Sequence, residues 1–272
     1  MRLVYLAVLA SAAFAQDAAD IVRRSLDRDA NNIERLRNYT FIERAEERFL
    51  DKNGKVTKTE SNAVEIVMLG GRPYGKKIAH NDKPLSADET RKEEEKLEKA
   101  AARRKLDLPK DAARRAKAQA EERRFLREIP EAFNLRVTGT EIISGKPTWV
   151  IEATPKPGYR PKMTQAKVFP KVRGKLWIDQ SEYQWVRAEA NVLDTISFGF
   201  GLLRVSQGSA LHFTQMRIND EVWVPQLVAV RADGRLGYLK KLRFDLQVDY
   251  RDYKKFPSDS RLLETEAVEA PK

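Results

Sequence analysis

Two periods of hydrophobic positions divide the 272-residue chain into helical and extended parts. Between residues 17 and 36 apolar side chains recur every three to four positions, as on one face of an amphipathic helix. Arg37 and Asn38 suit a helix end, because a base stabilises the last turn and asparagine tolerates the left-handed conformation after it. From Tyr39 the pattern favours β-structure, and two glycine-containing turns predict two or three antiparallel strands across residues 39–80.

Residues 86–128 differ in composition from the sequence on either side. Ser86 and Glu89 have the spacing of a capping box, which predicts a helix start, and Pro109 is expected at the first position of a second helix. The stretch contains 11 acidic and 14 basic residues, so this helical pair can bury little and is expected on the surface. Its few large apolar anchors are Leu97, Leu106, Leu108, Phe125 and Leu126.

From Pro130 to about Phe256 the pattern predicts consecutive antiparallel strands, with hairpin turns near residues 144–146, 180–183 and 219–220. The element order predicts one α+β domain over residues 16–256 with the charged helical insertion at about 86–128. It is expected to be built on a large curved antiparallel sheet, with the helices on one face or end. The polar tail, residues 257–272, is expected to be disordered.

The hairpin of residues 174–192 has one apolar face made largely of small side chains. Leu176 and Ile178 on its first strand are expected to pair with Val186 and Ala188 on the second. Small side chains leave volume above a sheet, which either the first helix or a ligand fills. This face and the apolar face near the C-terminus are expected to line one concavity beneath the first helix. The eight expected wall residues are Leu176, Ile178, Val186, Ala188, Leu242, Phe244, Leu246 and Val248.

Each of the four tryptophans precedes valine or isoleucine, which reflects β propensity at strand positions rather than a binding motif. Period two places Trp149 on the face of Ile151 and predicts a buried indole. Trp185 shares a face with Arg187 and Glu189 and is expected to be half exposed.

The first fifteen residues, MRLVYLAVLASAAFA, have the order of a signal peptide: a base, an apolar run and an Ala-x-Ala cleavage site. The run is shorter than the roughly 20 apolar residues of a membrane span. We therefore expect cleavage after Ala15 and a soluble, monomeric protein that is periplasmic or secreted. The chain has no cysteine, so disulfides cannot stabilise it and a hydrophobic core must.

Lysine and arginine total 51 against 40 aspartate and glutamate, which gives a net charge of +11. Export argues against nucleic acid as the partner of this charge and favours anionic lipid head groups or an acidic protein. The helical pair would supply the docking patch. Its basic residues are Arg103, Arg104, Lys105, Arg114, Arg115 and Lys117.

The sequence contains no recognisable catalytic signature. His80 in a loop and His212 on a strand are the only histidines, and no spacing around them suggests the three or four ligands of a metal site. No serine lies in a G-x-S-x-G turn, and the glycine-rich residues 197–201 do not match a phosphate-binding fingerprint. We therefore expect no enzymatic activity, no cofactor and no metal.

Several segments together resemble the LolA/LolB-like family of periplasmic lipoprotein carriers. They are the signal peptide, the amphipathic helix that runs into NYTF, the hairpin GKLWIDQSEYQWVRAE and the later strand INDEVWVP. In that family an incomplete barrel wraps around helices and holds acyl chains between them. The resemblance implies that Leu176, Ile178, Val186 and Ala188 belong to such a wall. Residues 86–128 depart from the compact family pattern.

Two functional hypotheses follow. The first is an exported, non-catalytic carrier or binder of an apolar ligand, either a lipid or the acyl chain of a lipoprotein. The second is a structural or interaction protein of the cell envelope, whose basic helical pair docks on an anionic membrane or an acidic partner.

The signal peptide gives a first testable prediction. N-terminal sequencing of the exported protein is expected to begin at Gln16, because Ala13 and Ala15 form the cleavage site. A mature chain that still begins at Met1 would remove the basis for the localisation.

Overall fold

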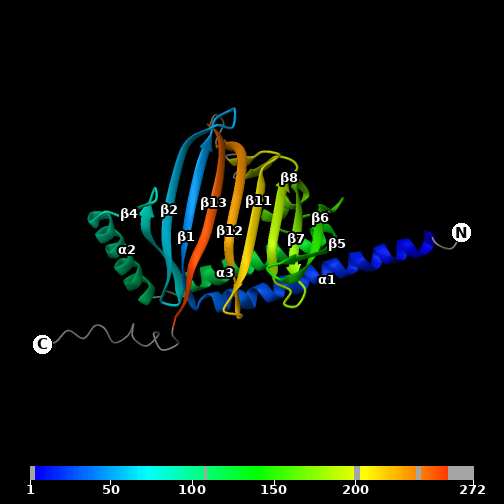
Figure 1. The fold of residues 1–272 in the computed structure, drawn as a ribbon, viewed down its shortest axis with the longest axis horizontal. Coiled ribbons are helices and arrows are strands. Elements are labelled where there is room, and N and C mark those ends of the chain that lie inside the picture. The colour runs from blue at the N-terminus through cyan, green and yellow to red at the C-terminus, as the bar shows by residue number, and fades with distance from the viewer. Residues whose placement is uncertain (1–3, 107–108, 199–202, 237–239, 257–272) are drawn as a thin grey trace.

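The structure, a computed structural model, describes residues 4–106, 109–198, 203–236 and 240–256. Figure 1 shows one large curved sheet whose strands stand side by side, with helices near one end of the strands and beside one edge. This is the α+β architecture expected from the sequence. The expected disordered tail lies outside the described residues.

Thirteen strands form the sheet, and neighbouring strands are antiparallel. They are β1 (Tyr39–Leu50), β2 (Val56–Leu69), β3 (Arg72–His80), β4 (Lys83–Pro84), β5 (Phe133–Ile143), β6 (Lys146–Pro155), β7 (Val172–Asp179), β8 (Trp185–Val192), β9 (Ile196–Phe198), β10 (Leu203–Val205), β11 (Ala210–Ile218), β12 (Val222–Leu236) and β13 (Lys240–Lys255). Their order is β4-β3-β2-β1-β13-β12-β11-β8-β7-β6-β5, and the β9–β10 hairpin joins β12 through β10. The end strands β4 and β5 are not paired with each other, so the barrel is incomplete.

The helices are α1 (Val4–Leu36), α2 (Ala87–Lys105), α3 (Pro109–Arg127), the short α4 (Ile129–Ala132) and the 3-10 helix η1 (Gln165–Lys171). α1 begins earlier than the sequence predicts, because its backbone continues through the expected signal peptide, and Figure 1 shows this part extending past β5. Within the described residues, no helix has both the length and the apolar character needed to cross a bilayer.

One face of the sheet is apolar across β5–β13, and α1 packs against it; we refer to this face as the inner face. Paired residues on neighbouring antiparallel strands point to the same side of a sheet. The register gives one such row across five strands: Leu176, Ala188, Phe213, Val228 and Val248. The two apolar faces that the sequence predicts separately therefore lie on the same side of the sheet.

α1 covers the inner face mainly over β5–β8. Ala18, Ile21 and Val22 of α1 are buried in a cluster with Ile151 on β6 and Ile178 on β7. The side chains of Ile151 and Ile178 have no exposed surface. Burying one aliphatic side chain stabilises a fold by roughly 1.5–3 kcal/mol. This cluster therefore dominates the attachment of α1 to the sheet.

Buried polar contacts fix the position of α1 along its axis. The Asn32 side chain donates to the carbonyl oxygen of Trp223 at 2.6 Å and accepts from its backbone N–H at 2.8 Å. The Trp185 indole donates to the hydroxyl of Ser25 at 2.6 Å. Since each of these groups would lose its partner if α1 moved by one residue, the helix has one favourable register.

The contact between Ser25 and Trp185 corrects the expected orientation of the β7–β8 hairpin. Trp177 pairs with Arg187, but Ile178 pairs with Trp185, so the register shifts by one residue at Val186. This bulge turns the Trp185 side chain towards α1, where it packs against the main core cluster. Val186 is 3% exposed but is not among the residues of that cluster. Trp185 is half-buried, as expected, but its side chain lies on the other face from the one expected, because strict alternation does not hold through the bulge.

The charged helical pair forms as expected. Ser86 and Glu89 make the predicted capping box, and Pro109 is the first residue of α3. Phe125 anchors the end of α3, since its ring stacks on that of Phe169 with centroids 4.7 Å apart. Leu106 is 72% exposed and is not an anchor.

The Asn32 contact predicts a large difference between two adjacent asparagines of α1. Asn32→Ala is expected to lower the free energy of unfolding by about 2 kcal/mol, because it leaves a buried N–H and a buried carbonyl without partners. Asn31→Ala, at an exposed position, is the matched control and is expected to change it by less than about 0.5 kcal/mol. Equal effects in urea denaturation would show that the Asn32 contact does not hold α1 in place.

Candidate functional site

Beyond α1 the inner face forms an open groove of about 350 Å³ across β8, β11, β12 and β13. Its apolar lining consists of Val172, Ala190, Val192, Val205, Ala210, Leu211, Val230, Ala232, Leu242 and Phe244. Leu211 lies in the middle of this face, yet 39% of its surface is exposed. An uncovered apolar surface of this kind is characteristic of a ligand or interaction site.

The groove is hollow because small side chains meet there on adjacent strands. Ala190 pairs with Gly174 on β7 and with Leu211 on β11. Ala232 pairs with Phe244 on β13. Two alanines and one glycine among larger neighbours leave a depression that the sheet cannot fill with its own side chains.

A short hairpin, β9–β10, closes one end of the groove. β10 pairs with the end of β12, where Val205 lies opposite Gly234. A Cβ atom at residue 234 would lie 2.1 Å from the carbonyl oxygen of Arg204, which is far inside van der Waals contact. Glycine at this position therefore allows the hairpin backbone to lie directly on β12.

Polar side chains bound the inner face on the side of β1. Glu43 on β1 pairs with Val64 on β2 and with Tyr250 on β13. Burial raises the pKa of the Glu43 carboxyl, and no described residue donates a hydrogen bond to it. A carboxyl therefore interrupts the apolar surface at this point of β1, whereas Phe49 on the same strand pairs with Phe244 of the groove.

In the structure, two of the eight expected wall residues line the groove, three belong to the core beneath α1, and three belong to neither. Leu242 and Phe244 line the groove. Leu176, Ile178 and Ala188 lie beneath α1 in the main core cluster and are 0–8% exposed. The remaining three are outside both sets: Leu246 and Val248 on β13, and Val186 at the bulge. Three groove residues that the sequence analysis did not single out are Leu211, Val230 and Ala232.

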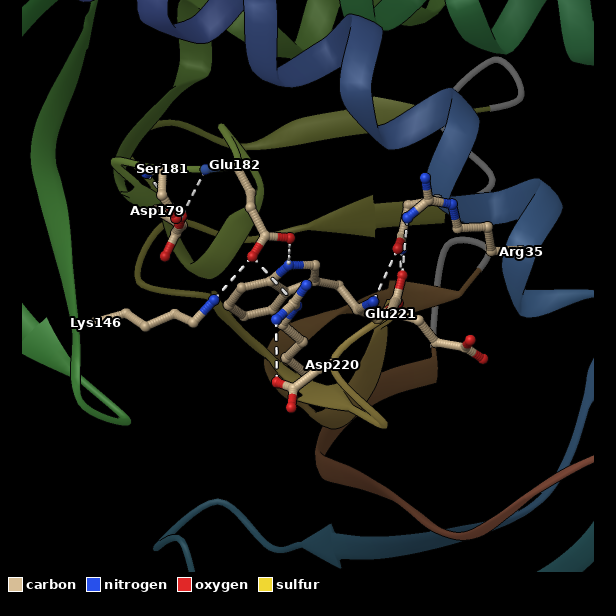
Figure 2. Close-up of polar contacts among 10 residues, drawn as sticks. Arg35, Lys146, Asp179, Ser181, Glu182, Asp220 and Glu221 are labelled. Atoms are coloured by element: carbon tan, nitrogen blue, oxygen red, sulfur yellow. Dashed lines mark hydrogen bonds and ion pairs between the residues drawn. The ribbon is translucent and has the colours of Figure 1, made fainter.

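A network of charged side chains connects the turns at the other end of the strands (Figure 2). Glu182, in the β7–β8 turn, accepts from Lys146 at 2.8 Å and from the Trp223 indole at 3.0 Å, and lies 3.2 Å from the guanidinium of Arg217. Burial alone would raise the pKa of Glu182, but these donors outweigh it and hold the pKa below its usual value. The turn is itself shaped by Asp179, which accepts three hydrogen bonds from residues 181 and 182.

The same network reaches α1 and so supports the closed side of the inner face. Arg35 donates to the carbonyl oxygen of Glu221 at 2.9 Å, next to the Asn32 contact with β12. Gln184 donates to Asp29 at 3.0 Å from the β7–β8 turn. These groups satisfy one another's charges and hydrogen bonds, which is typical of a structural network that positions a helix.

The predicted docking bases have different roles in the structure. Arg104 donates to the carbonyl oxygens of Leu69, Arg72 and Pro73 at 2.9–3.0 Å, and burial lowers the pKa of its guanidinium. It therefore holds the β2–β3 turn against α2 and is not part of a free docking surface. Arg115 is partly buried, whereas four of the predicted bases are exposed: Arg103, Lys105, Arg114 and Lys117.

The histidines lie apart from the groove lining. His80 contacts Asn62 at 3.0 Å, and His212 lies 3.5 Å from Glu189 on the outer face. In the part of the chain that the structure describes, no three His, Cys, Asp or Glu side chains are grouped as metal ligands would be.

No family model matches the sequence, and no curated protein matches it. Similar solved structures include a DUF1329 family protein from Desulfovibrio piger, with 11% identity, a TM-score of 0.33, and coverage of 89% of this chain and 93% of that one. A domain from Vibrio parahaemolyticus, described as an outer membrane lipoprotein-sorting protein, has 11% identity, a TM-score of 0.34, and coverage of 92% and 99%. A LolA superfamily protein from Nitrosomonas europaea has 10% identity, a TM-score of 0.29, and coverage of 90% and 96%. A member of the LolA superfamily is thus among the similar solved structures.

The close approach at Gly234 predicts a selective effect on the β9–β10 hairpin. Gly234→Ala is expected to lower the free energy of unfolding by about 1–3 kcal/mol, since the new methyl group overlaps the backbone of Arg204. Hydrogen exchange at residues 203–205 should become faster. Gly139→Ala is the matched control, because nothing lies within 4 Å of the added methyl group. Equal effects of the two changes would contradict the close approach.

Proposed function

We propose that this protein is an exported carrier or binder of an apolar ligand, and that the ligand occupies the groove between β8 and β13. The observation that carries the proposal is the open, apolar part of the inner face, where Leu211 remains 39% exposed. A large apolar surface that the protein's own side chains leave open is characteristic of a site that a ligand or partner covers when it binds.

The dimensions and chemistry of the groove favour an acyl chain over a polar metabolite. Its volume of about 350 Å³ lies within the range of roughly 300–1,000 Å³ that is usual for ligand pockets. The lining is mainly aliphatic side chains, alanine and one phenylalanine, which offer contact area. Its polar members lie towards the β9–β10 hairpin and β12: Arg204, Ser209, Arg231, Asp233 and Arg235. The resemblance of the β7–β8 hairpin to LolA-like carriers implies the same class of cargo, a lipid or a lipid-modified protein.

The proposed function has no catalytic step, and its location depends on the expected signal peptide. The ligand would enter from the open side of the groove, because α1 and its polar contacts close the other part of the inner face. Release would need no movement of α1. The carrier would then exchange its cargo without loss of its main core.

Two alanines on β8 provide a matched test. Ala190 lines the groove, whereas Ala188, two residues away on the same face, is 8% exposed beneath α1. Ala190→Trp is expected to weaken binding of a fluorescent fatty acid by about tenfold or more, because the indole occupies the ligand's space. Its melting temperature should remain unchanged, since the groove has room for the ring.

Ala188→Trp is expected to give the opposite pattern. The indole overpacks the core beneath α1, which costs about 1–3 kcal/mol or more of stability. A wild-type protein that binds no fatty acid, or an Ala190→Trp variant that binds as the wild type does, would overturn the proposed function.

A further inference from the structure

The helices α2 and α3 meet at an elbow, which we define as residues 103–106 and 110–117. In Figure 1 α2 lies outside the sheet edge formed by β3 and β4. Arg104 attaches the end of α2 to the β2–β3 turn through three carbonyl oxygens. No residue of the elbow lines the apolar groove, so the two surfaces are separate.

Bases near the start of α2 are paired with acids, whereas those at the elbow are not. Arg91 lies 3.1 Å from Asp88, and Lys96 lies 2.5 Å from Glu93. Five exposed bases of the elbow, which we call the elbow bases, have no ion pair or hydrogen bond with any described residue: Arg103, Lys105, Lys110, Arg114 and Lys117. Positive charge without a described partner is therefore concentrated at the elbow, although Lys92 on α2 and Arg123 and Arg124 on α3 are exposed bases in the same condition.

Helix stability explains only some of these bases. Arg103 and Lys105 lie in the last turn of α2, where positive charge complements the helix dipole. Lys110 lies in the first turn of α3, where the dipole disfavours positive charge, and Arg114 lies in the second turn, where the dipole neither favours nor disfavours it. Helix stability therefore does not account for these two bases.

The bases of α3 share one exposed face. Lys110, Arg114 and Lys117 are spaced at i, i+4 and i+7, which places them side by side along the helix. Asp111 and Arg115, on another side of α3, are partly buried against the protein. The charged face is therefore directed towards solvent.

A large apolar side chain is exposed among the elbow bases. Leu106 is the C-cap residue of α2 and is 72% exposed, the largest exposure among the large hydrophobic side chains that the structure describes. Unpaired bases around a protruding leucine combine the two features with which a peripheral helix binds a membrane surface.

We infer that the elbow docks on an anionic lipid surface, with the elbow bases over the head groups and Leu106 inserted between them. A bilayer presents anionic groups and an apolar layer directly beneath them, which matches this arrangement. Each base near such a surface strengthens binding by about fivefold. The docking needs no ligand in the groove, so its test is independent of the proposed carrier function.

The test is co-sedimentation of the exported protein with phosphatidylcholine vesicles that do or do not contain phosphatidylglycerol. Binding is expected only with phosphatidylglycerol, and it should weaken as salt screens the charges. The quadruple variant Arg103→Gln, Lys105→Gln, Lys110→Gln, Arg114→Gln is expected to bind about 600-fold more weakly, at about fivefold for each of the four charges. Leu106→Ser is expected to reduce binding by about tenfold.

A second quadruple variant shows whether binding depends on the elbow bases themselves or only on the net charge of the protein. Arg91→Gln, Lys92→Gln, Lys96→Gln and Lys99→Gln remove the same charge from the other end of α2, and binding should stay close to that of the wild type. Circular dichroism checks that both variants keep their helices. Equal losses in the two variants, or no binding to anionic vesicles, would overturn the inference. Binding to polyglutamate with the same base dependence, but not to vesicles, would assign the elbow to an acidic protein instead and would also overturn it.

Discussion

Ala18, Ile21 and Val22 press α1 onto the inner face of the sheet, and Asn32 fixes where along the sheet it lies. The apolar contact supplies most of the attachment energy, while the buried amide allows only one register. Since the apolar face extends from β5 to β13 and the core cluster lies mainly over β5–β8, part of that face is left uncovered. The groove is a consequence of this difference in extent between the helix and the sheet face.

The uncovered part remains hollow because of the side chains that the sheet presents there. Ala190 and Ala232 are too small to fill the space, and Gly234 lets the β9–β10 hairpin lie on β12 at one end of the groove. Larger residues would cover the surface and give a closed core instead. The charged network around Glu182 acts at the other end of the strands, where it holds the turns beside α1. The apolar groove, the β9–β10 hairpin and the charged network around Glu182 therefore all depend on how α1 lies on the sheet.

Local patterns predicted the fold well, because capping, turns and alternation act over a few residues. The start of α2 at the Ser86 capping box and the α+β sheet both follow from such signals. The bulge at Val186 could not be predicted in this way, since it leaves Ala188 on its expected face but places Trp185, on the other side of the bulge, on the face opposite to the one that alternation gives it. Arg104 resembles a free surface base in sequence, and only the fold brings the carbonyl oxygens of the β2–β3 turn to it. The division of the wall between core and groove depends on where α1 crosses the strands, which is a tertiary property: α1 meets β12 at Trp223, whereas the groove lies further along β12 at residues 230–235.

Photo-crosslinking with a diazirine-labelled fatty acid tests most directly whether the uncovered part of the inner face holds an apolar ligand. The label should attach to peptides that contain Leu211, Val230 and Phe244, which line the groove. Peptides that contain Ile151, which α1 buries completely, should remain unlabelled. Labelling spread evenly over the sheet, or confined to the charged helices, would contradict the account.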